Sequence, residues 1–115
     1  MNRDIGLYLK DILDNMERAE EFIGTLTYEE FSKDTKTSYA VVRCLEIIGE
    51  ASKNIPGDIR RKYPDIPWKE MAGMRDKVIH FYFGLNFHKV WLVVKDDLPQ
   101  IKLLIKKVLN DLEGV

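Results

Sequence analysis

The amino-acid sequence predicts an all-α fold: an antiparallel up-and-down bundle of four to five helices, forming one domain over residues 1–115. Three long segments repeat apolar residues at alternating steps of three and four, the spacing of one face of a helix. No segment shows the strict alternation of apolar and polar residues that marks a half-buried strand. The chain has 115 residues, 45% of them hydrophobic, which suits a single core, and its short connections favour antiparallel neighbours.

The first predicted element is a long amphipathic helix that begins beside Asp4, a residue type suited to the N-cap position. Gly24 lies near its predicted end. Thr27 and Glu30 then have the spacing of a capping box, which predicts a short helical turn directly afterwards. The apolar face of the first helix comprises Ile5, Leu9, Ile12, Met16, Ala19, Ile23 and Leu26.

The second long helix is predicted from about Thr35 to Ile55, because Pro56 and Gly57 then stop the helical pattern. The segment 56–67 holds three prolines and predicts a loop with room for one helical turn. The core-facing residues of this second helix are expected to be Val41, Cys44, Ile48, Ala51 and Ile55, flanked by Leu45 and Ile47.

Two further helices complete the predicted bundle. One runs from about Trp68 to Phe83, and the last carries its apolar residues from Phe87 to Leu112. Pro99 lies inside the last segment, so it should either start a new helix or kink this one. The apolar stripe of this segment also contains Trp91, Val94, Leu98, Ile101, Ile105 and Val108, with Leu104 beside it.

Composition narrows the classes of function. The net charge of −1 gives no general attraction for nucleic acid or membrane, so any anion site has to be a local patch. Cys44 is the one cysteine, which excludes an intrachain disulfide and a cysteine zinc cluster. The longest run without Asp, Glu, Lys or Arg, residues 78–88, is far shorter than the ~20 residues that span a bilayer. We expect a cytoplasmic protein without membrane contact, metal or cofactor.

The stretch RDKVIHFY, residues 75–82, gathers the residues with the most chemistry. His80 carries an imidazole, which exchanges protons near neutral pH, and Asp76 one helical turn earlier could orient it. Arg75 suits holding a phosphate or stabilising charge that develops on one. Histidine with arginine points to metal-free chemistry on an RNA phosphodiester, whose 2′-hydroxyl is a built-in nucleophile that DNA lacks. The alternative is an amphipathic helix whose polar side happens to hold a histidine.

Helical geometry separates the members of this stretch. Arg75 and Tyr82 are seven residues apart and lie on one flank, whereas Arg75 and His80 are roughly 140° apart on an ideal helix. A joint site therefore needs a reaching arginine, a distorted helix or a second copy of the chain. Ile79 and Phe83 add apolar surface beside His80, which favours a two-fold contact between copies.

At these residues the sequence resembles the HepT-like branch of the HEPN superfamily, whose motif is Arg, four residues, His, one residue, Tyr. The match is complete at Arg75, His80 and Tyr82. Three longer blocks resemble the same family in the same order: LEIIGEASKNIP at 45–56, IPWKEMAGMRDKVIHFYFGLNFHKVW at 66–91 and KDDLPQI at 95–101.

The resemblance implies a specific biology. Such proteins are all-helical homodimers and metal-independent endoribonucleases that serve as the toxins of toxin–antitoxin pairs. It implies catalytic Arg75 and His80, and an antitoxin that is a minimal nucleotidyltransferase transferring AMP from ATP to Tyr82. The added phosphate and bulk would block RNA beside the site. Two rival hypotheses are a non-catalytic nucleotide-binding or regulatory subunit of a nucleotidyltransferase complex, and a purely structural adaptor.

Several other residues have weaker signals. Glu46 and Glu50 are one helical turn apart and suit a metal, a shared proton or a salt-bridge face; we assign Glu50 to supporting Arg75 or the dimer. We expect Trp68 and Trp91 to serve packing and His88 to be structural. A basic lip could grip the RNA backbone, or could simply be a solvated loop; it comprises Arg60, Arg61, Lys62 and Lys69.

Overall fold

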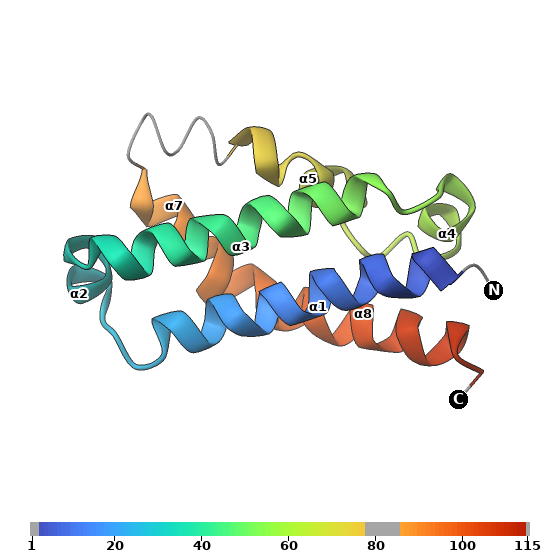
Figure 1. Cartoon of the computed structure of the whole chain (residues 1–115), viewed down its shortest axis with the longest axis horizontal. Helices are drawn as coiled ribbons and strands as arrows, with labels where there is room; N and C mark the ends of the chain where they lie inside the picture. The colour runs from blue at the N-terminus through green and yellow to red at the C-terminus, as the bar shows by residue number, and fades with distance from the viewer. Residues whose placement is uncertain (1–2, 78–85, 115) are drawn as a thin grey trace.

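The computed structural model describes residues 3–77 and 86–114, and in these ranges every regular element is a helix, which confirms the predicted all-α class (Figure 1). None of the helices in these ranges is both long enough and apolar enough to cross a membrane. The elements in chain order are α1 (Arg3–Ile23), α2 (Tyr28–Lys33), α3 (Thr35–Lys53), α4 (Gly57–Lys62), α5 (Trp68–Ala72), α7 (Phe87–Leu92), the π-helix η1 (Val93–Asp97) and α8 (Leu98–Leu112).

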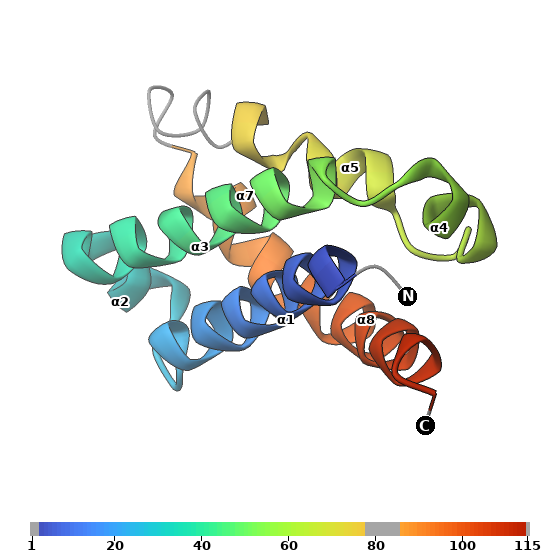
Figure 2. The same ribbon diagram turned by 45° about the vertical axis from the view of Figure 1, so that its right-hand side comes forward.

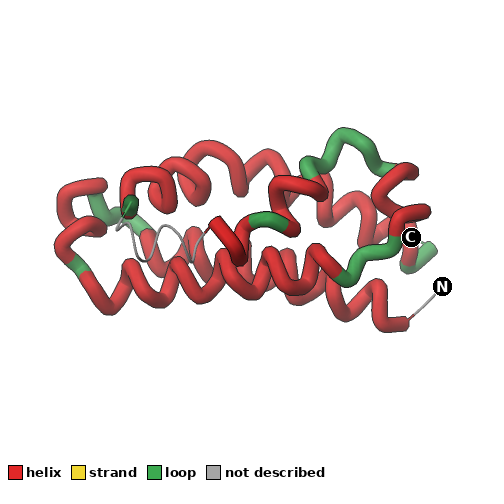
Figure 3. The backbone as a smooth tube through the Cα atoms, turned by 90° about the horizontal axis from the view of Figure 1, so that it is seen from above, coloured by secondary structure: helices red, strands yellow, loops and turns green. Residues whose placement is uncertain are grey.

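Three long helices, α1, α3 and α8, form the body of the bundle. α3 runs back along α1 in the opposite direction, and α8 packs on the other side of α1, while α5 covers α3 (Figures 1 and 2). The two ends of the chain lie at one end of the bundle, where Lys10 Nζ is 3.8 Å from Glu113 Oε1. Seen from above, the stretches of described backbone that join consecutive helices are short (Figure 3).

The core forms where the apolar stripes of the helices meet, as the periodicity predicts. The α1 stripe from Leu9 to Ile23 is almost fully buried, and so are Ile48 of α3 and Ile105 of α8. Burying such stripes is the main favourable term in helix packing. The short helices add Phe31, Trp68 and Met71 to the same cluster.

Cys44 lies in this core, and burial raises the pKa of its thiol. The neutral thiol is therefore favoured at this position, and Cys44 behaves as a small apolar residue.

The helix ends explain the boundaries of the first half of the chain. The predicted capping box is present: Thr27 Oγ1 accepts from the Glu30 N–H at 3.2 Å, and Glu30 Oε1 accepts from the Thr27 N–H at 2.9 Å. Gly24, with φ +52°, turns the chain after α1, a conformation that favours glycine. Asp4 lies within the first turn of α1, so its prediction as the N-cap is wrong.

The N-cap of α3 is Asp34, which was not predicted from the sequence. Its carboxylate accepts from the Thr37 N–H at 3.0 Å and from the Thr37 hydroxyl at 2.8 Å. These two hydrogen bonds, the backbone bond first, lower the pKa of Asp34 because they favour its charged form. A charged cap at the positive end of the helix dipole stabilises the start of α3.

The predicted single helix from Trp68 to Phe83 is wrong in its described part. α5 ends at Ala72, and Gly73 makes a turn in which its N–H donates to the Lys69 carbonyl at 3.0 Å. Residues 74–77 are helical again, and the Lys77 N–H donates to the Gly73 carbonyl. The apolar spacing of the sequence continues across this break, because a single turn residue, Gly73, separates the two helical stretches.

Pro99 lies at the start of a new helix, α8, which is one of its two predicted roles, and it changes the hydrogen bonding of the chain before it. Proline has no N–H, so Pro99 cannot donate to the Lys95 carbonyl as an α-helix requires. The chain before it widens into the π-helix η1, and the Leu98 N–H donates to the Val93 carbonyl five residues back. Pro99 then occupies the first turn of α8, where its missing donor costs little.

Candidate functional site

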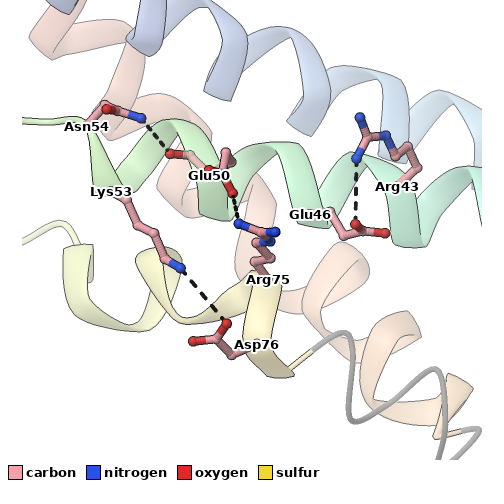
Figure 4. A network of polar contacts seen from close by, with 7 residues as sticks. All are labelled: Arg43, Glu46, Glu50, Lys53, Asn54, Arg75 and Asp76. Carbon is pink, nitrogen blue, oxygen red and sulfur yellow. Dashed lines mark hydrogen bonds and ion pairs between the residues drawn. The ribbon is translucent and has the colours of Figure 1, made fainter.

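The described part of the predicted motif begins with Arg75, on the short helical segment that follows Gly73. Its guanidinium Nη1 donates to Glu50 Oε2 of α3 at 2.6 Å, and both side chains are exposed (Figure 4). The prediction that Glu50 supports Arg75 therefore has a direct contact behind it. A charge-assisted bond of this length orients the arginine, while solvent keeps its net energy small.

Arg75 lies at the edge of a groove of about 360 Å³ between α1 and α3. Two arginines, Arg43 and Arg75, face three carboxylates in it, so each guanidinium has a counter-charge nearby. The groove is lined by Tyr8, Asp11, Arg43, Glu46, Ile47, Glu50, Ala51, Asn54 and Arg75. Tyr8 and Asp11 come from α1 and were not predicted, because their placement depends on how α1 packs against α3.

Polar contacts organise the surface around this groove. Arg43 Nη1 lies 3.6 Å from Glu46 Oε2 on the same face of α3. The Asn54 side chain donates to the Glu50 carbonyl oxygen at 3.0 Å, at the C-terminal end of α3. Figure 4 shows these contacts arranged along α3 with Arg75 entering from the neighbouring segment. Glu46 and Glu50 each form an ion pair with an arginine, which is the arrangement of the predicted salt-bridge face.

Of the other residues of the RDKVIHFY stretch, the structure describes Asp76 and Lys77. The carboxylate of Asp76 lies 3.9 Å from Lys53 Nζ of α3, a long exposed contact (Figure 4). Arg75 and Asp76 thus both face α3 and meet oppositely charged partners there. His80 and Tyr82 lie outside the described residues, and so do Ile79 and Phe83, the apolar residues expected to favour a two-fold contact.

The four basic residues predicted as an RNA-binding lip have different surroundings. The Arg60 guanidinium donates to the Ser52 carbonyl at 2.6 Å and to the Ile55 carbonyl at 3.0 Å, so it caps the end of α3. Lys62 Nζ lies over the Tyr63 ring, 5.7 Å from its centroid. Arg61 and Lys69 are exposed. The described residues that line the groove beside Arg75 include none of the four.

The aromatic residues outside the motif serve packing, as predicted. Trp68 is buried, and its Nε1 donates to the Tyr63 carbonyl at 2.9 Å. Trp91 is half-buried and packs with its ring centroid 5.5 Å from that of Phe31. His88 makes an edge contact with Tyr28 at 5.1 Å between centroids. The ring contacts of Trp91 and His88 join α2 to α7 and hold the segment after residue 85 against the bundle.

Comparisons with known proteins identify the family. The family model described as ribonuclease HepT-like matches residues 12–108. A Methanocaldococcus jannaschii protein, named as a candidate RNase, is 53% identical over 112 residues, covering 97% of this chain and 93% of that protein. "Probable ribonuclease HepT" of Thermococcus cleftensis is 51% identical over 108 residues, covering 94% and 98%.

A bacterial relative extends the set. A candidate RNase of Caldanaerobacter subterraneus subsp. tengcongensis is 44% identical over 103 residues, covering 90% of this chain and 92% of that protein. No solved structure is significantly similar to the chain. The matched region includes the α3 residues of the groove, Arg75 and the whole predicted motif, whereas Tyr8 and Asp11 of the groove precede it. The chain belongs to the HepT-like ribonuclease family.

Proposed function

We propose that this protein is an endoribonuclease whose catalytic residues are Arg75 and His80. The observation that carries the proposal is the placement of Arg75: an exposed guanidinium at the edge of a groove, held by Glu50 at 2.6 Å, five residues before His80 in the motif. A guanidinium so placed can receive a phosphate of an RNA strand. Membership of a ribonuclease family supports the same assignment.

The proposed reaction uses the RNA's own 2′-hydroxyl and requires no metal ion. The 2′-oxygen attacks the adjacent phosphorus, and the bond from phosphorus to the 5′-oxygen of the next nucleotide breaks. The products are a 2′,3′-cyclic phosphate and a 5′-hydroxyl. His80 carries one of the two protons that move, and Arg75 stabilises the charge on the phosphoryl oxygens as the bonds change.

Glu50 and Asp76 support this chemistry from different sides. Glu50 sets the direction of the Arg75 guanidinium. Because the pair is solvent-exposed, the carboxylate only weakly offsets the attraction of the guanidinium for a phosphate. Asp76 lies beside Lys53, and we propose that it orients His80 while Lys53 limits its freedom. Arg61, Lys62 and Lys69 are proposed to contact the RNA backbone farther out, whereas Arg60 keeps its capping contacts.

We further propose that the active species is a homodimer that acts as the toxin of a toxin–antitoxin pair. Helical spacing separates Arg75 from His80, so a second copy beside the motif can complete each site. The proposed antitoxin is a minimal nucleotidyltransferase that transfers AMP from ATP to Tyr82. Ideal helical spacing puts Tyr82 on the same flank as Arg75, so the phosphodiester formed there would add negative charge that opposes RNA binding.

RNA cleavage by the purified protein tests the enzymatic proposal. The parent is expected to cleave a single-stranded RNA in EDTA and to leave DNA of the same sequence intact. His80→Ala is expected to abolish cleavage with an unchanged helical circular dichroism spectrum. A folded His80→Ala protein that cleaves as fast as the parent contradicts the assignment of His80. Cleavage that stops in EDTA and returns with a divalent metal contradicts the metal-free mechanism.

Intact-mass analysis after co-expression with the nucleotidyltransferase tests the regulation. The expected result is mass added in units of AMP on the parent and none on Tyr82→Phe, together with loss of RNA cleavage in the modified protein. Unchanged mass with an active nucleotidyltransferase and ATP contradicts the proposed modification. Sedimentation gives the oligomeric state, and a monomer at micromolar concentration contradicts the shared site.

A further inference from the structure

The backbone of Arg75 approaches α3 more closely than a side chain would permit. The point of approach is Gly49, a buried glycine inside α3. A methyl group added there would lie 2.6 Å from the Arg75 backbone nitrogen, 3.2 Å from Arg75 Cβ and 3.3 Å from the Met71 carbonyl oxygen. The first distance is shorter than real Cβ contacts allow, and the atom it meets is backbone, which cannot turn aside as a flexible side chain can.

Glycine in the middle of a helix is unfavourable on its own account, because it loses more backbone freedom than alanine on folding. At Gly49 this disadvantage is offset by a contact that brings the 74–77 segment onto α3. The next residue in the chain is Glu50, whose carboxylate receives the Arg75 guanidinium at 2.6 Å. Two consecutive residues of α3 thus contact the same arginine, one at its backbone and one at its side chain.

Gly73 provides an internal contrast on the segment itself. A methyl group there would lie 3.4 Å from the Lys69 carbonyl oxygen and 3.6 Å from the Glu70 carbonyl oxygen, which are ordinary contact distances. Its φ of −80° and ψ of −7° suit alanine. Gly73 lies two residues before Arg75, so Gly73→Ala changes the same segment without closing the space against α3.

We infer that Gly49 is a positioning residue for Arg75: its missing side chain sets the depth at which the arginine lies on α3, and so where the guanidinium meets RNA. This inference rests on the proposed function, in which Arg75 acts on the phosphate. An added methyl group pushes the backbone of Arg75 outward and lengthens or breaks the contact with Glu50. Displacements of about 1 Å at a reacting group can lower a rate by on the order of a hundredfold.

Kinetics of RNA cleavage give the first test. Gly49→Ala is expected to lower kcat by on the order of ten- to a hundredfold with a smaller change in KM, and Gly73→Ala to retain the parent values. In an Arg75→Lys background, Gly49→Ala should lower the remaining rate by much less than in the parent, because both changes act on one group. Equal effects in the two backgrounds, or parent-like kcat in Gly49→Ala, overturn the inference.

A second measurement is independent of catalysis and so separates the two proposals. In the nitrogen NMR spectrum of the labelled protein, the Nε–Hε signal of Arg75, identified by its loss in Arg75→Lys, should shift in Gly49→Ala toward its position in Glu50→Gln. Gly73→Ala should leave it in place. This result supports the positioning even if the parent fails to cleave RNA, which would count against the proposed function alone. An unmoved signal overturns the positioning.

Folding is the remaining control. Gly49→Ala should keep the helical circular dichroism spectrum, because the three atoms nearest to the added methyl group belong to Arg75 and Met71 and none belongs to α1 or α8. A variant that loses its helical signal shows that Gly49 serves the whole fold, and overturns a specific effect on Arg75. The longer Gly49→Val is expected to reduce kcat further while still retaining helix.

Discussion

Two ion pairs of nearly equal length differ in what surrounds them. Lys102 Nζ of α8 lies 2.7 Å from Glu20 Oε1 of α1, and the two side chains are only 23% and 27% exposed. Arg75 Nη1 lies 2.6 Å from Glu50 Oε2, with side chains 46% and 55% exposed. The first pair joins two long helices of the bundle, and the second joins α3 to a short segment at the edge of a groove.

The difference shows that distance alone does not reveal what an ion pair contributes. A half-buried pair is less screened by water, and removing one partner leaves a charge in a poorer environment, so the pair acts on stability. An exposed pair gives little net energy, and its arginine remains open to an incoming anion. The Glu20–Lys102 pair is therefore expected to serve the fold, and the Glu50–Arg75 pair to serve the site.

The largest expected effect is the loss of Arg75. Arg75→Ala should lower the rate of RNA cleavage by ~10²–10³-fold, because one stabilising group for the charged transition state is removed. Lys102→Ala is the matched control and should cleave RNA at the parent rate at a temperature where both proteins are folded. Equal losses of activity in the two variants would show that the two ion pairs do not differ in their importance for cleavage.

Neutralising the carboxylates gives the next largest effect. Glu50→Gln keeps the size of the side chain but weakens its hold on Arg75, and should reduce kcat by on the order of tenfold. Glu20→Gln should leave kcat unchanged. The measurement is single-turnover cleavage of the same RNA by both variants. Parent-like kcat in Glu50→Gln would mean that Arg75 is positioned by its backbone contact alone.

For the free energy of unfolding, the order of the two variants should be the reverse of their order for kcat. Glu20→Gln is expected to lower the free energy of unfolding by about 1 kcal/mol, because the partly buried Lys102 loses its counter-charge. Glu50→Gln should lower it by about 0.5 kcal/mol or less. Urea unfolding followed by circular dichroism measures both. A larger loss in Glu50→Gln than in Glu20→Gln contradicts the assignment of the two pairs to site and fold.

The smallest expected effect is the response to salt. Double-mutant cycles on unfolding should give the Arg75–Glu50 pair a coupling of about 0.5 kcal/mol at low ionic strength that largely disappears in ~1 M NaCl. The Lys102–Glu20 coupling should persist to a greater extent, since less water and fewer ions reach it. Couplings with the same salt dependence would show that the difference in exposure has no energetic consequence.

Much of the fold follows from local pattern. The α1 stripe, the Thr27–Glu30 capping box and the stop at Pro56 all depend on residues within a few turns of one another, and all three agree with the structure. The break at Gly73 was not predicted, because apolar spacing continued through it. A kink or a new helix at Pro99 was predicted, but the π-helix before it was not. The sequence does not reveal how a helix adjusts to the missing N–H donor of a proline.

The candidate site also combines features that follow from local sequence with features that depend on packing. Family membership and the candidate residues could be predicted because the motif and its neighbouring blocks are continuous in sequence. Arg60 could not be recognised as the cap of α3, because its two acceptors depend on the turn of the chain after Pro56. Tyr8 and Asp11 reach the groove only through the packing of α1 on α3.

The sequence by itself determined the long helices α1, α3 and α8, their buried faces and the residue types available for chemistry, because these depend on spacing along one chain. Only the tertiary structure decided that Arg75 meets Glu50, 25 residues earlier in the chain. That contact needs the close approach of two helical segments at Gly49. Such an approach follows from the shape of both surfaces together, which the order of residues on either helix does not reveal.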